Sequence, residues 1–170
     1  INVPEGDLQR LLRAVQEDWG LELADWDSTL LGHLQQALRD GKWQVTVAVR
    51  DGRRVVAVLP GFRDRIYGAA IDVGSTTIAV NLCDLGSGEV LASAGAMNPQ
   101  IRFGEDLMSR VSYAMLNEDG AARMTQTVRE ELDRLLQQTA EQAGIRPEEI
   151  LELTLVGNPV MHHLVLGMDP

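Results

Sequence analysis

Cysteine is nearly absent from the sequence, which has 170 residues and a single cysteine, Cys83. A disulfide framework and a cage of thiolate metal ligands therefore cannot be built within this chain. Aromatic residues make up only 4% of the sequence. The 25 Asp and Glu outnumber the 15 Lys and Arg, which gives a formal net charge of −10. Nucleic acids and anionic membranes attract basic surfaces, so we expect neither as a partner.

Long apolar runs are missing as well. No stretch approaches the roughly 20 apolar residues needed to cross a bilayer, and no signal peptide is visible, so the cytoplasm is the expected location. The sequence begins at Ile1 without an initiator methionine and stops directly after an apolar segment, so we expect a piece of a longer protein. Its length and its 45% hydrophobic content suit one domain or two small ones.

Residues 1–64 show two helical patterns followed by an alternating one. Apolar residues at three- and four-residue spacing predict helices around residues 8–19 and 30–38. Apolar alternation over residues 43–49 and 55–59, on either side of Asp51-Gly52, predicts a β-hairpin. We therefore expect a helix–helix–hairpin module that ends at the Pro-Gly and charged stretch of residues 60–65. Nothing in it looks catalytic, and Trp19, Trp26 and Trp43 are interpreted as core residues.

The second region, residues 65–170, opens with YGAAIDVGSTTIAV at residues 67–80. Two apolar runs predict buried strands, and Gly74 supplies the turn between them. The turn offers the Asp72 carboxylate, three hydroxyls and backbone amides that Gly74 leaves uncovered. Amides and hydroxyls suit phosphate oxygens, and a carboxylate suits hydrated Mg²⁺. An ordinary hairpin rich in Ser and Thr is the other interpretation, and the turn alone does not separate the two.

The remaining pattern predicts a third strand over residues 89–97, two helices with apolar stripes at 107–116 and 124–140, and a strand at 151–156. Gly157-Asn158-Pro159 then leads into a last helix, with Asn158 as the N-cap. The expected order in this half is β-β-β-α-α-β-α, which makes an α/β unit with its turns gathered at one edge of a sheet. Ligands tend to bind at such edges.

This order, with the Asp-x-Gly-Ser-Thr-Thr stretch, resembles one RNase H-like lobe of the acetate and sugar kinase, Hsp70 and actin superfamily. Two longer runs make the resemblance more specific: NPQIRFGEDLMSRVSYA at residues 98–114 and VGNPVMHHLVLGMDP at 156–170. With them the chain is similar to the reductive activators of corrinoid proteins. Residues 1–64 resemble the middle domain of these activators, and residues 65–170 resemble the N-terminal part of their actin-like ATP-binding domain.

The resemblance implies a function and a set of ligands. Such activators use ATP binding and hydrolysis to drive the uphill reduction of Co(II) cobalamin to Co(I), so a corrinoid protein or a corrinoid-dependent methyltransferase is the implied partner. A homodimer is left open. ATP and Mg²⁺ would bind in the complete domain, with Asp72 facing the metal ion through water. The residues expected at this site are Asp72, Gly74, Ser75, Thr76, Thr77, Gly157 and Asn158.

The family also carries a 2Fe–2S cluster held by four cysteines. This chain has one, so the cluster is expected only in an upstream domain absent from this chain. We expect the fragment alone to be inactive, and no catalytic residue is identified. Two other functions stay open: a small-molecule kinase of the same superfamily, and a non-enzymatic module in which nucleotide gates binding to a protein partner.

Several residues in the two long runs have no clear role at this point. His162 and His163 are adjacent on a predicted helix and point about 100° apart, which favours packing or helix-end roles over ligation of one metal ion. Asp106 is a candidate helix cap. The sequence gives no physical role to Gln100 or Gly104.

Overall fold

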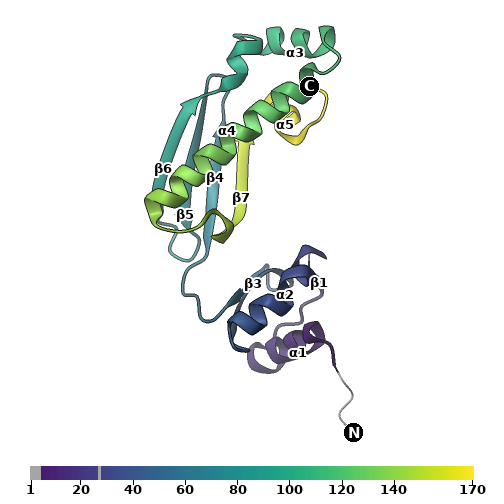
Figure 1. Ribbon diagram of the computed structural model, residues 1–170, viewed down its shortest axis with the longest axis vertical. Coiled ribbons are helices and arrows are strands. Elements are labelled where there is room, and N and C mark those ends of the chain that lie inside the picture. The colour runs from purple at the N-terminus through teal and green to yellow at the C-terminus, as the bar shows by residue number, and fades with distance from the viewer. Residues whose placement is uncertain (1–4, 27) are drawn as a thin grey trace. The chain divides into compact units, whose positions relative to one another are not determined.

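The computed structural model describes residues 5–26 and 28–170 and divides into two compact units, residues 1–64 and 65–170 (Figure 1). The first unit contains the elements α1 (Asp7–Trp19), β1 (Asp25–Trp26), α2 (Ser28–Asp40), β2 (Val45–Arg50) and β3 (Arg54–Pro60). Its sheet has the order β1-β3-β2, with the hairpin β2–β3 antiparallel and β1 parallel to β3. The sequence pattern did not predict β1, because two residues carry no readable alternation.

The core of the first unit lies between the helices and the sheet. Leu30 and Leu34 of α2 and Leu11 of α1 pack there with Val55 and Val58 of β3. Leucines at helical spacing form one side of this contact. Val55 and Val58 form the other: they are three residues apart, and the shift in the β2–β3 register that leaves Val56 without a partner lets both be buried.

The prediction that Trp19 and Trp43 are core residues is wrong, since their exposed fractions are 78% and 58%. Trp19 is the last residue of α1, and Trp43 lies in the turn after α2 with a φ of 69°. Trp19 lies at the very end of α1 and Trp43 lies beyond the end of α2, so the core does not cover either side chain. The Arg10 guanidinium lies 5.1 Å from the centre of a Trp43 ring. Trp26 is half-buried against the core, as expected.

The second unit is a four-stranded mixed sheet with helices. Its elements are β4 (Tyr67–Val73), β5 (Thr77–Asp84), β6 (Val90–Met97), the 3₁₀ segment η1 (Pro99–Phe103), α3 (Leu107–Leu116), α4 (Gly120–Ala143), the 3₁₀ segment η2 (Pro147–Glu149), β7 (Ile150–Gly157) and α5 (Pro159–Leu166). The strand order is β6-β5-β4-β7, in which only the β4–β7 pair is parallel. The α/β class and the predicted order β-β-β-α-α-β-α are confirmed.

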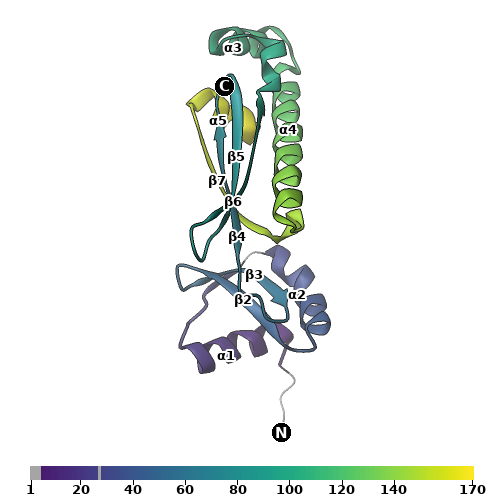
Figure 2. The same ribbon diagram turned by 90° about the vertical axis from the view of Figure 1, so that its left-hand side faces the viewer.

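Helix α4 lies along one face of this sheet (Figures 1 and 2). Its buried residues Met124, Val128 and Leu135 meet alternate residues of the central strands, among them Ile71 and Val80. In β4 the residues between the buried ones, Ala70 and Asp72, are exposed, because successive side chains of a strand point to opposite faces. One face of the sheet is thus buried by α4, and Asp72 belongs to the other.

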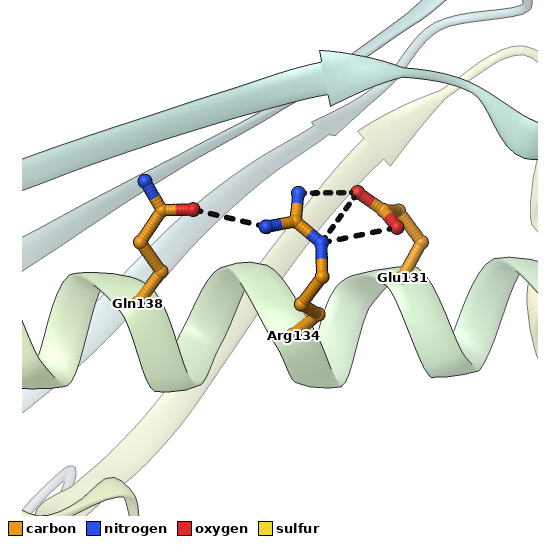
Figure 3. Close-up of polar contacts among 3 residues, drawn as sticks. All are labelled: Glu131, Arg134 and Gln138. Carbon is orange, nitrogen blue, oxygen red and sulfur yellow. Dashed lines mark hydrogen bonds and ion pairs between the residues drawn. The ribbon is translucent and has the colours of Figure 1, made fainter.

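The outer surface of α4 carries a charged cluster. Arg134 donates to the Glu131 carboxylate at 2.6 Å and to the Gln138 side-chain oxygen at 3.1 Å (Figure 3). The bond to Glu131 raises the pKa of Arg134 above its ordinary value. None of the helices formed by residues 5–26 and 28–170 is long and apolar enough to cross a membrane.

We expect limited trypsin digestion to cut first after Arg63 or Arg65 and to leave two folded fragments. The residues 62–65 between the two units are exposed and lie outside helices and strands, and such segments are the preferred sites of nicking. Arg134, exposed within α4, is the internal control and should be cut much later. Mass spectrometry of the early fragments measures this. Early cuts inside either unit, with Arg63 and Arg65 intact, would contradict two separately folded cores.

Candidate functional site

The carboxyl ends of β4 and β7 lie side by side. Their parallel register pairs Asp72 with Val156 and Val73 with Gly157, so the turn after β4 and the turn after β7 open on the same edge of the sheet. The seven residues proposed from the sequence all come to this edge: Asp72, Gly74, Ser75, Thr76, Thr77, Gly157 and Asn158. Asp72 and Thr77 are the exposed strand residues that flank the turn, which itself consists of residues 74–76.

Both glycines are needed for close approach of backbone to backbone. A Cβ on Gly74 would lie 2.7 Å from the carbonyl oxygen of Thr77, and one on Gly157 would lie 2.9 Å from the carbonyl oxygen of Val73. Real Cβ atoms do not tolerate such distances from a fixed backbone atom. At these two positions the edge therefore presents backbone atoms that no side chain of the residue itself covers.

The polar side chains of the edge differ in what they contact. Asn158 is engaged locally, since its Oδ1 accepts from the Met161 amide at 3.0 Å and caps α5. The Asp72 carboxylate and the Thr76 hydroxyl are exposed, and neither has a hydrogen-bond or ion-pair partner within residues 5–26 and 28–170. A carboxylate, free hydroxyls and turn amides form a donor set that suits phosphate oxygens together with a hydrated divalent cation.

Asn98 holds the turn from the interior, with an exposed fraction of 1%. Its Nδ2 donates to the carbonyl of Gly74 at 2.8 Å, and its backbone amide donates to the carbonyl of Thr76 at 2.7 Å. Its Oδ1 accepts from the Gln100 amide at 2.9 Å and so starts η1. Asn98 therefore ties the end of β6 to the β4–β5 turn, a role that its neighbours in the sequence do not reveal.

Arg110 is the buried cation of the site, with an exposed fraction of 0%. Its Nη2 donates to the carbonyl of Ser75 at 2.6 Å, its Nε donates to the carbonyl of Gly104 at 2.9 Å, and its Nη1 lies 3.5 Å from the thioether of Met161. Burial lowers the pKa of the Arg110 guanidinium, and the charge of Asp106 partly opposes this. Arg110 was not among the site residues expected from the sequence.

Three residues without a clear role in the sequence now have structural ones. Gln100 is fully buried and donates to the carbonyl of Met124 at 3.1 Å, which links η1 to α4. A Cβ on Gly104 would lie 2.7 Å from the Arg110 amide, so this glycine lets α3 pack closely. Asp106 caps α3 by accepting from the Ser109 amide at 2.7 Å, as predicted, and this bond lowers the pKa of Asp106.

The two histidines have separate environments. His163 Nδ1 lies 2.8 Å from the carbonyl oxygen of Asp169, at the end of α5, where its role is that of a helix-end residue. His162 Nε2 is buried and has no hydrogen-bond partner within the described part of the chain. In that same part no three His, Cys, Asp or Glu side chains are grouped so that they could hold a metal ion.

Comparisons with known proteins agree on one family. The family model described as the RACo linker region matches residues 1–65, and the one described as the RACo middle region matches residues 67–170. The corrinoid activation enzyme RamQ of Eubacterium limosum is 28% identical over 146 residues, which cover 85% of this chain and 25% of RamQ. A solved structure named as a reductive activator for a corrinoid, iron-sulfur protein is 36% identical, with a TM-score of 0.79 over 98% of this chain and 27% of that one. The chain thus spans about a quarter of these relatives.

We expect Asn98→Ala to lower the free energy of unfolding of the second unit by roughly 3 kcal/mol, because the Gly74 carbonyl loses its buried donor and η1 loses its cap. Urea unfolding followed by circular dichroism measures the loss. Asn81→Ala is the matched control: its Oδ1 accepts from the exposed Ser93 hydroxyl at 2.7 Å, so about 1 kcal/mol or less should be lost. Equal losses in the two variants would show that Asn98 does not hold the turn.

Proposed function

The chain belongs to the RACo family, and on that premise we propose that it is a part of an ATP-dependent reductive activator, one that returns the Co(II) corrinoid of a methyltransferase system to Co(I). In the intact protein, residues 65–170 would supply the first phosphate-holding lobe of an actin-like ATP-binding domain. The names of the similar proteins, a corrinoid activation enzyme and a reductive activator, support this over a small-molecule kinase.

One observation carries the proposal: the meeting of the β4–β5 turn and the β7–α5 turn at a single sheet edge, with polar groups that have no partner in the described residues. The amides and hydroxyls of Ser75 and Thr76 would hold phosphate oxygens. Asp72 would face hydrated Mg²⁺, which usually keeps several of its waters. Gly157 would let the phosphate chain approach the backbone of the second turn.

ATP, when bound, supplies the free energy that the uphill electron transfer requires. The residues of this edge bind and orient it, and phosphoryl chemistry depends on groups from several elements at once. We therefore expect the isolated 170-residue chain to bind Mg-ATP more weakly than the intact protein, which contains the opposing lobe.

The iron–sulfur cluster of such activators does not fit this chain. Its single cysteine, Cys83, is half-buried within β5 and cannot provide a set of cluster ligands. The electron carrier would therefore belong to another part of the intact protein. The partner is a corrinoid protein, and an acidic chain of net charge −10 is not suited to nucleic acid.

The test replaces Asp72 by alanine in the intact protein. Hydrogen bonds to charged groups contribute roughly 1.5–3 kcal/mol, so ATP-dependent reduction should fall by about one to two orders of magnitude. The rate is followed as the loss of the Co(II) signal in electron paramagnetic resonance. The fold should persist, because the carboxylate is exposed and its removal leaves no cavity.

Asp133→Ala is the control, since Asp133 is an exposed carboxylate on α4 far along the chain from the turn. It should leave the rate within about twofold. A lowered melting temperature with unchanged ATP dependence in Asp72→Ala would identify Asp72 as a turn-stabilising residue and would reject the phosphate site.

A further inference from the structure

The β4–β5 turn is held by its carbonyl groups. The carbonyls of Gly74, Ser75 and Thr76 are consecutive in the chain, and each accepts a hydrogen bond: from Asn98 Nδ2 at 2.8 Å, from Arg110 Nη2 at 2.6 Å and from the Asn98 amide at 2.7 Å. Both donor residues are buried, with exposed fractions of 1% and 0%. All three carbonyl oxygens are therefore directed to donors in the interior of the unit.

The orientation of the amides follows from the geometry of the peptide bond. In a trans peptide the C=O of one residue and the N–H of the next point in opposite directions, and the structure contains no cis peptide bond in its described residues. The amides of Ser75, Thr76 and Thr77 are consequently directed away from Asn98 and Arg110. Those of Ser75 and Thr76 have no acceptor within residues 5–26 and 28–170. Successive amides of this kind form an anion-binding concavity.

Arg110 differs from an ordinary structural arginine in its partners. They are two backbone carbonyls and a thioether, and no carboxylate lies within ion-pair distance in the described residues. The charge of Asp106 acts on the pKa of Arg110, but the Oδ1 of Asp106 accepts its hydrogen bond from the Ser109 amide. A buried cation without a countercharge is costly, and it favours an anion placed on the other side of the Ser75–Thr76 peptide.

We propose that Arg110 is a positioning residue for an anionic ligand of this turn, a phosphate chain, and that it acts through the Ser75–Thr76 peptide. Its hydrogen bond fixes the Ser75 carbonyl inward and polarises the peptide, which makes the Thr76 amide a better donor. The negative charge of the bound ligand then serves as the countercharge that Arg110 lacks in the protein. The inference rests on the proposed phosphate site and adds to it a residue 35 positions away that touches neither phosphate nor metal ion.

The test uses the intact protein with Arg110→Met, Arg110→Lys and Arg129→Met. Methionine keeps the stem and removes the charge and the donors. Lysine keeps the charge and cannot donate in three fixed directions as the guanidinium does. Arg129 is the matched control, because it also donates to a backbone carbonyl, that of Val165 at 2.8 Å, at the other end of α5 from the turn. The probes are Mg-ATP and inorganic tripolyphosphate, measured by calorimetry, and the KM and kcat of ATP-dependent corrinoid reduction.

We expect Arg110→Met to raise the Kd for both probes and the KM for ATP by about ten- to hundredfold, with a smaller change in kcat. Arg110→Lys should recover part of the affinity, and Arg129→Met should stay within about twofold. The increase in melting temperature caused by Mg-ATP should shrink in Arg110→Met. A purely structural role would instead lower the melting temperature of the nucleotide-free protein and leave the KM unchanged.

The outcomes separate the two proposals. Wild-type KM in Arg110→Met, at any melting temperature, overturns the role of Arg110, and the phosphate site stands if Asp72→Ala still loses ATP dependence. If neither Asp72→Ala nor Arg110→Met affects ATP, the phosphate site itself is rejected. Should Arg110→Met fail to fold, Arg110→Lys decides: an unchanged KM overturns the inference, and a raised KM with near-normal kcat supports it.

Discussion

The candidate site depends on one pairing, the parallel ladder between β4 and β7. The two strands are separated by more than 70 residues of chain, which include two strands and two helices, and yet their carboxyl ends align residue by residue. Without this register the β4–β5 turn would be an isolated hairpin end with a few free hydroxyls. With it, a second turn and the start of α5 reach the same edge, and backbone groups from two distant segments can face one ligand.

A second layer of organisation lies beneath that edge. Asn98, Gln100 and Arg110 belong to the segment between β6 and α4, are almost fully buried, and direct most of their hydrogen bonds to backbone carbonyls. Buried polar groups of this kind fix geometry, because each unmade bond would cost more than a made one contributes. The segment from η1 to α3 is therefore a support for the turn, and Gly104 allows close packing within it, because a Cβ there would lie 2.7 Å from the Arg110 amide.

Much of the fold was predictable from the sequence, and the reason is local periodicity. Period-two patterns gave the strands, the three- and four-residue spacing gave the helices, and Asn158-Pro159 marked the start of α5. The order of elements then predicted the shared edge. The two-residue β1 was not predicted, because it is too short to show a pattern. The exposure of Trp19 and Trp43 was not predicted either, because the apolar pattern does not show that one ends α1 and the other lies in a turn.

Arg110 was out of reach for a related reason: its main acceptor is 35 residues away. The apolar residues of α3 also marked the wrong face of the helix, because Met108, Met115 and Leu116 are exposed. The inward face instead carries Arg110, with Leu107 and Ala114 beside it. Asn98 gave no signal either, because a polar residue after a strand and before Pro99 is typical of an ordinary turn.

The entry of the chain into the second unit has a mechanical consequence. Residues 65–66 lead directly into β4, which is a central strand bonded to β5 on one side and to β7 on the other from Tyr67 to Val73. A pull on residue 65 along the axis of β4 would act perpendicular to the hydrogen bonds of its antiparallel ladder, and so would load both ladders in shear. The bonds of a ladder loaded this way share the force, whereas bonds loaded from an end open one after another. A pull at residue 65 is therefore taken up by β5 and β7 along the length of β4, and little of it reaches the Gly74 turn at the other end of the strand.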